Sequence, residues 1–338
     1  MSHVAISLLG PFHVTRDGKP ISHFATDTAR ALLAYLAMHS QAPCRRETLA
    51  GLLWPDEPEP DALRNLRQAL SRLRQAIGDS AAHPTFLIGT PQTLQLNPDS
   101  DYWLDVAAFA DAMSSTRRHA HRRLERCASC IGRLQEAVEW YRGDFLAEFS
   151  LSSVPLEEWL VVQREGLHHQ ALEALHCLAA HHEGQAEYEQ ALRYARRQIE
   201  LEPWREVAHR QAMRALALGE QRDAALAQYE TCLRVLAEEL GVHPEAETTV
   251  LCQRIRDDEE LQAGLAVPPH NLPAALTPFV GRERELAQIE ECLQDPACRL
   301  LTLVGLGGIG KTRLALEAAM EQVNAFEHGV FFVPLASV

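Results

Sequence analysis

A helical stripe of apolar residues between positions 62 and 77 is the feature that most constrains how this chain folds. Its members follow one another at spacings of three, four, three and four residues: Leu63, Leu66, Leu70, Leu73 and Ile77. This period predicts an amphipathic helix over 62–77 with its apolar side packed on a domain core. The opposite side of that helix then presents polar side chains to solvent.

The segments before this helix predict strands and two further helices. Residues 4–22 alternate apolar and polar side chains around the turn RDGKP, which is typical of short antiparallel strands. A helix follows the capping candidates Thr26 and Asp27. A second, shorter helix ends at Trp54-Pro55.

The segments that flank helix 62–77 complete a small domain. The acidic loop PDEPEPD (55–61) precedes the helix, and TFLIGTPQTLQLNP after it predicts two strands around a turn. Strands, three helices and a terminal hairpin in this order predict an α/β winged helix-turn-helix domain over residues 1–100.

Basic charge is concentrated on helix 62–77. Four Arg and one acidic residue lie between Asp61 and Gly78, although residues 1–100 are balanced in charge. Arg pairs with guanine, and Asn or Gln with adenine, in the major groove. The predicted DNA-binding residues are Arg64, Asn65, Arg67, Gln68, Ser71, Arg72 and Gln75. Arg67 and Arg74 lie nearer the apolar edge, so we expect them to reach phosphates; the alternative is an ordinary helix with a solvated polar face.

Residues 101–262 are predicted to be helical throughout. GQAEYEQALRYARRQI (184–199) is echoed by GEQRDAALAQYETCL (219–233), and the pair Ala191-Leu192 returns 34 residues later as Ala225-Leu226. This period is typical of tetratricopeptide-type helix pairs. We therefore expect an all-α, TPR-like domain, followed by a Pro-rich linker at 263–278.

Two sets of motifs resemble known bacterial regulators. ARALLAYLAMHSQAPCRRETLAGLLWPD and ALRNLRQALSRLRQAIG resemble the OmpR-type winged helix of SARP-like transcriptional activators. YRGDFLAEF, LEEWL, EPWREVAHRQAMRAL and LAEELGVHPEAET resemble the bacterial transcriptional activator domain that follows it in that family.

The resemblance implies a function and partners. A recognition helix would enter the major groove of double-stranded DNA, a wing would contact the minor groove or backbone, and protomers would associate on direct repeats in promoters. It also implies contact with RNA polymerase, for which the acidic loop 55–61 is a candidate; a solvated turn is an equal alternative.

A glycine-rich loop dominates the segment 279–338. VGLGGIGKT comes at the end of a predicted apolar strand at 300–304 and precedes a predicted helix at 311–323, which is the context of a P-loop. With LTPFVGRERELAQIEECL before it, the segment resembles the first part of a STAND-class α/β ATPase module. The predicted residues for ATP or ADP with Mg²⁺ are Val280, Arg282, Gly305, Gly307, Gly308, Gly310, Lys311 and Thr312.

We do not expect this chain to be an enzyme. Phosphoryl transfer needs an acidic residue at the end of a second strand, and the only candidate strand after Lys311, GVFFVPLA, carries none. We therefore expect an incomplete module that binds nucleotide weakly without turnover, and predict no catalytic residues. Two alternatives remain: a STAND-type nucleotide-hydrolysing switch, and a TPR-like protein-interaction scaffold.

A cluster of His and Cys offers metal ligands. HAHRRLERCASC places His119, His121, Cys127 and Cys130 within twelve residues, a set that zinc could bind tetrahedrally. The alternative is that the two Cys pack as small apolar residues and the His are exposed. We favour the second interpretation because the chain has no second Cys-x2-Cys pair.

Composition sets the remaining limits. The net charge of −14 argues against a broad nucleic-acid-coating surface but permits a small basic one. Apolar runs are too short for a membrane span, no signal peptide opens the chain, and the eight Cys are too few for a secreted disulfide scaffold. We expect a cytoplasmic, mainly α-helical, multidomain protein that does not bind membranes.

Overall fold

The structure is a computed structural model. It describes residues 3–21, 24–119, 123–147, 149–257, 271–273, 279, 281–295, 297–305, 309–323, 326 and 329–333. The chain forms two compact units, of which the first comprises 1–114 and 135–174 and the second 115–134 and 175–338. Each unit is considered by itself.

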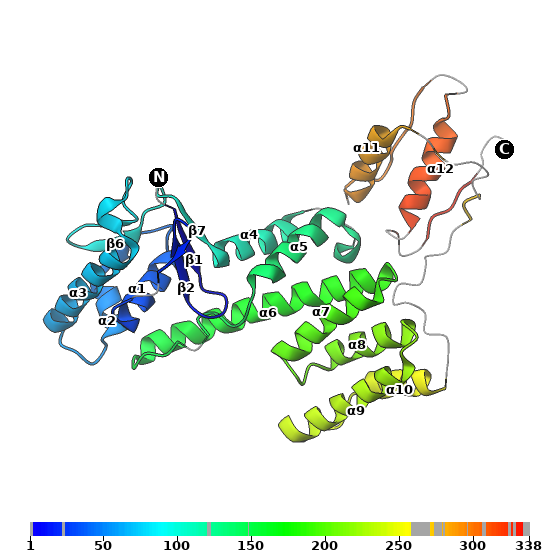
Figure 1. Cartoon of the computed structure of the whole chain (residues 1–338). Coiled ribbons are helices and arrows are strands. Elements are labelled where there is room, and N and C mark those ends of the chain that lie inside the picture. The colour runs from blue at the N-terminus through cyan, green and yellow to red at the C-terminus, as the bar shows by residue number, and fades with distance from the viewer. Residues whose placement is uncertain are drawn as a thin grey trace. The chain divides into compact units, whose positions relative to one another are not determined.

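A four-stranded sheet in the order β3-β2-β1-β7 opens the first unit (Figure 1). Its strands are β1 (Val4–Ser7), β2 (His13–Arg16), β3 (Lys19–Pro20) and β7 (Tyr102–Leu104). β1 pairs antiparallel with β2, Ile6 opposite Val14, and parallel with β7, Val4 opposite Tyr102. The expected antiparallel strands are confirmed. The expectation of helix throughout 101–262 is wrong at β7, because three residues are too short to show a period.

Three helices pack beside this sheet, as the sequence predicts. They are α1 (Asp27–Met38), α2 (Arg46–Leu53) and α3 (Glu59–Ile77). Thr26 caps α1, since its hydroxyl accepts a hydrogen bond from the Ala29 amide at 3.4 Å. α3 begins three residues before the predicted start, so Glu59, Pro60 and Asp61 form its first turn and the acidic loop is shorter than expected. A Pro in the first turn and two acids near the helix N-terminus favour this earlier start.

The predicted terminal hairpin forms the wing. β5 (Leu87–Gly89) pairs antiparallel with β6 (Thr93–Leu96), and the Thr90 and Thr93 hydroxyls lie 2.8 Å apart across the turn. A third strand, β4 (Cys44–Arg45), pairs with β6 and joins the start of α2 to the wing.

Residues after position 104 also pack on the first unit. α4 (Asp105–Arg118), α5 (Ala128–Trp140) and α6 (Val154–Gly184) each contribute part of their length to it. Trp159 lies 5.0 Å from the Tyr35 ring of α1, centroid to centroid, and the Ser153 hydroxyl donates to the Leu52 carbonyl. Arg164 donates to the carbonyls of Phe145, Leu146 and Phe149. The winged-helix elements and these later residues therefore share one packed unit.

Helix pairs with the predicted 34-residue period form part of the second unit. They include α7 (Tyr188–Leu201), α8 (Glu206–Leu218), α9 (Arg222–Glu239) and α10 (Ala246–Arg256). Ala191 and Ala225, equivalent in the repeat, are buried in the same apolar core. The TPR-like prediction is confirmed for this region.

The segment around the glycine loop contains helices but not the predicted strands. α11 (Glu283–Gln294) and α12 (Lys311–Glu321) share a small core of Ile289, Leu314 and Ala318. Within the described residues, neither 300–304 nor 329–333 forms a strand, and Leu300 and Val304 are 85% and 90% exposed. An extended apolar run forms a strand only where a neighbour pairs with it. The linker 263–278 lies outside the described residues except for Asn271–Pro273.

None of the helices in the described ranges combines the length and the hydropathy that crossing a bilayer requires.

Candidate functional site

The apolar side of α3 anchors the candidate interface. Leu66, Leu70, Leu73 and Ile77 are buried as predicted, together with Ala62 and Ala69. Leu63 is only half-buried, because it lies at the edge of the core beside the wing. α3 is therefore fixed along one side and free along the other.

The polar side of α3 carries the predicted DNA-binding residues. Six of them are exposed: Arg64, Arg67, Gln68, Ser71, Arg72 and Gln75. Asn65 is half-buried at the flank, where a base edge is less accessible than from the centre of the face. Arg64 forms an ion pair with Asp61 at 2.6 Å, and exposed pairs of this kind are weak. This pair leaves Arg64 on the exposed face of α3.

A basic groove lies between α3 and the wing. Its lining consists of Arg46, Leu63, Arg67, Leu70, Ser71, Arg74 and Pro91. Arg46 donates to the Thr90 carbonyl at 2.8 Å, which ties α2 to the turn of the wing. A Cβ placed on Gly89 would lie 3.2 Å from Arg74 Nη2 and 3.4 Å from Arg46 Nη2, so the two guanidinium groups converge over the wing.

The charges of this groove are only partly balanced. Arg74 forms an ion pair with Asp79 at 3.3 Å, and Asp79 also accepts a hydrogen bond from the Leu87 amide. Burial, followed by the positive charges of Arg74 and Arg67, lowers the pKa of the Arg46 guanidinium from its ordinary value. Arginine nevertheless stays protonated in proteins. The groove therefore carries excess positive charge, which a phosphate could neutralise.

Arg46 is a candidate functional residue that sequence reasoning missed. It starts α2 and follows β4, so no helical period connects it with α3. Only the pairing of β4 with β6 brings it to the wing.

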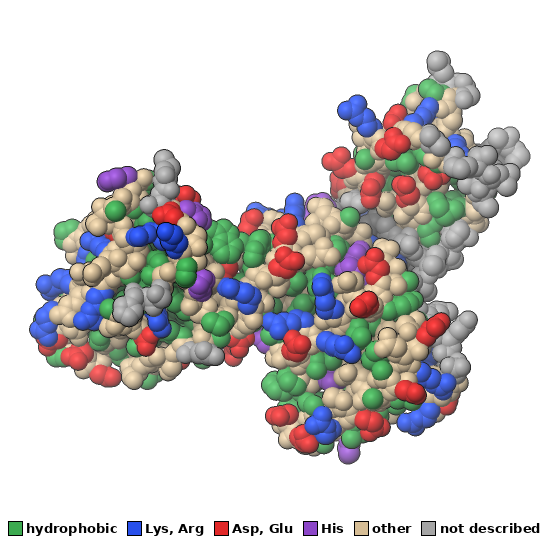
Figure 2. Space-filling view, viewed as in Figure 1, with side chains coloured by type: hydrophobic (Ala, Val, Ile, Leu, Met, Phe, Trp, Pro, Cys, Tyr) green, Lys and Arg blue, Asp and Glu red, His purple; other side chains and the backbone are tan. Residues whose placement is uncertain are grey.

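A second groove borders the other flank of α3. Arg16, Asp17 and Lys19 of the β2–β3 hairpin line it together with Arg72 and Gln75. Arg16 donates to the Ile77 carbonyl at the end of α3, which holds the hairpin beside the helix. Lys and Arg side chains gather over α3 in Figure 2. Basic groups therefore flank the exposed face of α3 on both sides.

The predicted nucleotide-binding residues are partly described. Val280, Gly307 and Gly308 lie outside the described residues. Lys311 starts α12 and donates from Nζ to the Gly305 carbonyl at 2.8 Å, after Gly310 with a left-handed φ of 88°. Arg282 donates to the Ile309 carbonyl at 2.6 Å, and Thr312 is exposed. The structure brings Arg282, Gly305, Gly310 and Lys311 together around the loop, but shows no P-loop sheet in the described residues.

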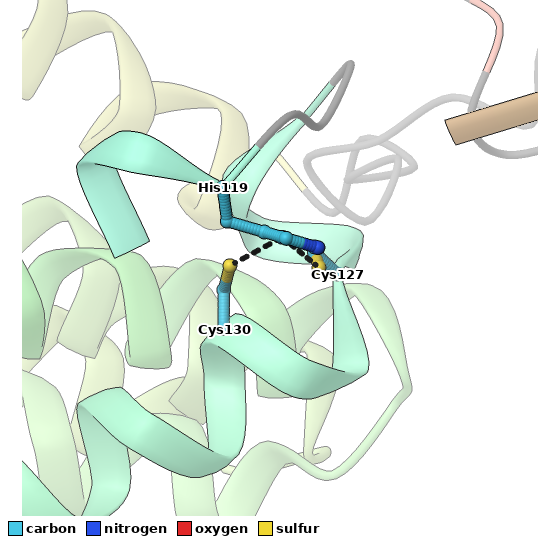
Figure 3. A group of neighbouring side chains, drawn as sticks. All are labelled: His119, Cys127 and Cys130. Carbon is cyan, nitrogen blue, oxygen red and sulfur yellow. Dashed lines mark hydrogen bonds between the residues drawn. The ribbon is translucent and has the colours of Figure 1, made fainter. Parts of the chain in front are cut away.

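Three of the four predicted metal ligands meet in the second unit (Figure 3). The potential ligand atoms of His119, Cys127 and Cys130 all lie within 4.8 Å of one another. Cys127 and Cys130 are buried, as the packing interpretation predicts, but His119 is half-buried between them rather than exposed. Burial, followed by the effect of Cys127, raises the pKa of the Cys130 thiol to about 12. His121 lies outside the described residues.

Comparison with known proteins identifies two domains. Residues 22–92 match the family described as transcriptional regulatory protein, C terminal. Residues 104–256 match the bacterial transcriptional activator domain.

Two curated relatives match almost the whole of this chain. The regulatory protein AfsR of Streptomyces coelicolor is 28% identical over 97% of this chain, and AfsR of Streptomyces griseus is 27% identical over the same share. The chain spans about one third of the length of these relatives, 33% and 34%.

A solved structure supports the fold. Mycobacterium tuberculosis EmbR, in complex with a low-affinity phosphopeptide, gives a TM-score of 0.58 at 24% identity over 78% of this chain and 67% of that chain. At this identity the likeness concerns the fold alone. The chain carries the domain pair of SARP-like regulators, an OmpR-type C-terminal regulatory domain followed by a bacterial transcriptional activator domain.

Proposed function

We propose that this protein is a sequence-specific DNA-binding transcriptional activator that reads promoter DNA through α3. The observation that carries the proposal is the exposed polar face of α3, fixed by a buried apolar side and flanked by two basic grooves. A helix of this kind fits the major groove, which is wide enough to admit it.

The two kinds of basic residue would have different tasks. Arg64 and Gln68, at the centre of the exposed face, would pair with base edges. Arg46, Arg67 and Arg74 converge between α3 and the wing, where they would hold a phosphate of the backbone. The first pair would set the sequence that is read, and the second set would contribute affinity for any DNA.

Activation is the finer part of the proposal. Protomers would associate on direct repeats in a promoter, and the acidic segment before and at the start of α3 would contact RNA polymerase. Asp56, Glu57 and Glu59 are exposed in that segment, and Asp61 is half-buried. Such a regulator would act in the cytoplasm, where the bacterial chromosome lies.

The proposal extends to nucleotide binding by the glycine loop. ATP or ADP with Mg²⁺ would replace the Gly305 carbonyl as the partner of Lys311 and bind at the N-terminus of α12. Binding of a labelled ATP analogue, lost in Lys311→Ala, would support this; equal binding by both proteins would contradict it. Hydrolysis is not part of the proposed function.

Capture of genomic DNA fragments by the full chain tests the main proposal. The comparison is between the wild type, an Arg64→Ala/Gln68→Ala variant, and an Arg196→Ala/Arg234→Ala control that removes exposed charge from α7 and α9. We expect the wild type and the control to enrich one repeated motif and the α3 variant to lose it. Unselective capture that salt alone removes, the same for all three proteins, would show phosphate attraction only and contradict the proposal.

A further inference from the structure

The cluster of His119, Cys127 and Cys130 belongs to the second compact unit, whereas α3 belongs to the first, and the cluster has no role in the proposed function. Its side chains come from three places on the chain. His119 follows the end of α4, Cys127 follows a short 3-10 turn at Leu124–Arg126, and Cys130 lies in the first turn of α5. All three belong to the second compact unit. The fold therefore brings together donors that the sequence separates by up to eleven residues.

We propose that His119, Cys127 and Cys130 bind one zinc ion, through His119 Nδ1 and the two Sγ atoms. His119 Nδ1 lies 3.2 Å from Cys130 Sγ and 3.4 Å from Cys127 Sγ. Zn–S bonds of about 2.3 Å and Zn–N bonds of about 2.0 Å, at tetrahedral angles, place a sulfur and a nitrogen about 3.5 Å apart. The observed separations are close to that value, so zinc would need only small side-chain movements.

The arrangement of the donors also favours a metal over simple packing. Two Cys packed as small apolar residues need no polar partner, yet the same imidazole nitrogen faces both sulfurs (Figure 3). A Cys-x2-Cys pair at the start of a helix presents both sulfurs to one side, which is a common zinc-binding spacing. Two thiolates and an imidazole suit zinc better than magnesium or calcium, which prefer oxygen donors.

The binding step balances in charge and protons. Each thiol releases one proton to solvent as its sulfur bonds to zinc, so the two thiolates neutralise the 2+ charge of the ion. His119 binds as the neutral imidazole. The described residues supply three of the four ligands of a tetrahedral site, and a water molecule or another donor would complete it.

Zinc at this place would have a structural effect. It would connect the end of α4 to the beginning of α5 and so close the short segment between residues 119 and 127. Because a ligand that binds only the folded state stabilises it, zinc should raise the unfolding temperature of the second unit.

The full chain, purified under reducing conditions, provides the test. The zinc content of each protein is measured after extensive dialysis against a chelating resin. Co²⁺ then replaces zinc in a second sample of each protein. Cobalt bound by Cys gives a near-ultraviolet thiolate charge-transfer band, and its visible bands report tetrahedral geometry. The variants are Cys127→Ser, Cys130→Ser and His119→Ala, with Cys232→Ser as the control because Cys232 is equally buried but lies on α9.

We expect one zinc ion per chain in the wild type and in the control, and a cobalt spectrum of a tetrahedral two-thiolate site. Each of the three ligand variants should no longer retain one zinc ion per chain. The unfolding temperature of each variant should then equal that of the metal-free wild type. A wild-type chain without retained zinc and without a cobalt–thiolate band would overturn the proposal. So would ligand variants that are folded by circular dichroism and keep the full zinc content. The wild-type spectrum decides the matter even where a variant does not fold.

Discussion

At the scale of single residues, Asp105 holds the end of β1 against the start of α4. Its carboxylate accepts hydrogen bonds from the amides of Leu8, Leu9 and Val106 at 2.8–2.9 Å, and Arg142 lies 3.5 Å away. The residue is 1% exposed. Burial raises the pKa of Asp105, while the three amide hydrogen bonds oppose that rise. A single carboxylate thus satisfies several amides that have no strand partner at this point.

Replacing Asp105 by Asn tests this role. An amide side chain offers one acceptor oxygen, so its NH₂ group would face amides that also donate. We expect Asp105→Asn to lower the free energy of unfolding of the first unit by about 2 kcal/mol, the typical effect of leaving a buried donor unsatisfied. Urea unfolding measures this. The control Asp99→Asn, at an exposed position, should stay within about 0.5 kcal/mol of the wild type.

At the scale of elements, the 34-residue repeat is visible in the backbone as well as in the sequence. Ala186 and Glu220, which are equivalent in the repeat, both adopt a left-handed φ of 59°. The amides that follow them, of Glu187 and Gln221, donate to the carbonyls of His182 and Leu216 at 2.9 and 2.8 Å. The same turn therefore ends one helix and begins the next in both repeats.

Glycine at these two turns should stabilise the second unit. A left-handed conformation costs a residue with a Cβ roughly 1–2 kcal/mol, and glycine avoids that cost at some loss of unfolded-state entropy. We expect Ala186→Gly and Glu220→Gly each to raise the free energy of unfolding by about 0.5 kcal/mol. Ala212→Gly, inside α8, should lower it by about 1 kcal/mol. If the free energy of unfolding decreased in both Gly variants, the left-handed backbone of Ala186 and Glu220 would not be a source of strain, and the prediction would be contradicted.

The basic groove between α3 and the wing predicts a specific salt dependence. Each phosphate contact contributes about one unit to the slope of log affinity against log salt. We expect Arg46→Ala to weaken binding to all DNA sequences similarly and to reduce that slope by about 1. Fluorescence anisotropy at several salt concentrations measures this. An unchanged slope would show that Arg46 does not contact a DNA phosphate.

The sequence could predict the elements that are long enough to show a periodic pattern. The apolar stripe of α3 identified its buried side, and the 34-residue spacing identified the helix pairs. The short strands β4 and β7 could not be found, because two or three residues carry no alternation and form only where a neighbouring strand pairs with them. The place of Arg46 in the groove could not be predicted for the same reason, because it depends on the pairing of β4.

Two expectations failed where local pattern competed with context. The acidic residues at 59–61 were expected in a loop, although a Pro and acids are also typical of a first helical turn. The apolar run at 300–304 was expected to be a strand, but no described segment pairs with it. For His119, spacing alone favoured exposure, and only the fold shows that it lies between two thiols.

At the scale of the whole molecule, the two compact units should respond differently to acid. Burial lowers the pKa of both His176 and His209, and both lie in the second unit. The His209 ring also bonds to the Pro203 carbonyl and the Gln228 amide, each at 2.8 Å, which fits the neutral form. Because the folded pKa is lower than the unfolded one, the unfolded state takes up protons first as the pH falls.

We therefore expect the free energy of unfolding of the second unit to be highest above a pH of about 6.5 and to decrease as the pH falls below that value. The unfolding temperature of that unit, followed by calorimetry between pH 8 and 5, measures the effect. His209→Gln should reduce the dependence, since one of the two buried imidazoles is then removed. His243→Gln, at an exposed position, should leave it intact; equal pH dependence in both variants would contradict this account.

The claim that α3 reads DNA sequence is tested most directly by a specificity ratio. The measurement compares the affinity of the full chain for its enriched repeat with that for a scrambled duplex at one salt concentration. We expect Arg64→Ala and Gln68→Ala each to cost about 1–3 kcal/mol on the repeat and little on the scrambled duplex, so that the ratio falls. The Arg196→Ala/Arg234→Ala control should keep the wild-type ratio. If the α3 variants weaken both duplexes equally, or neither, α3 does not read the bases and the account is contradicted.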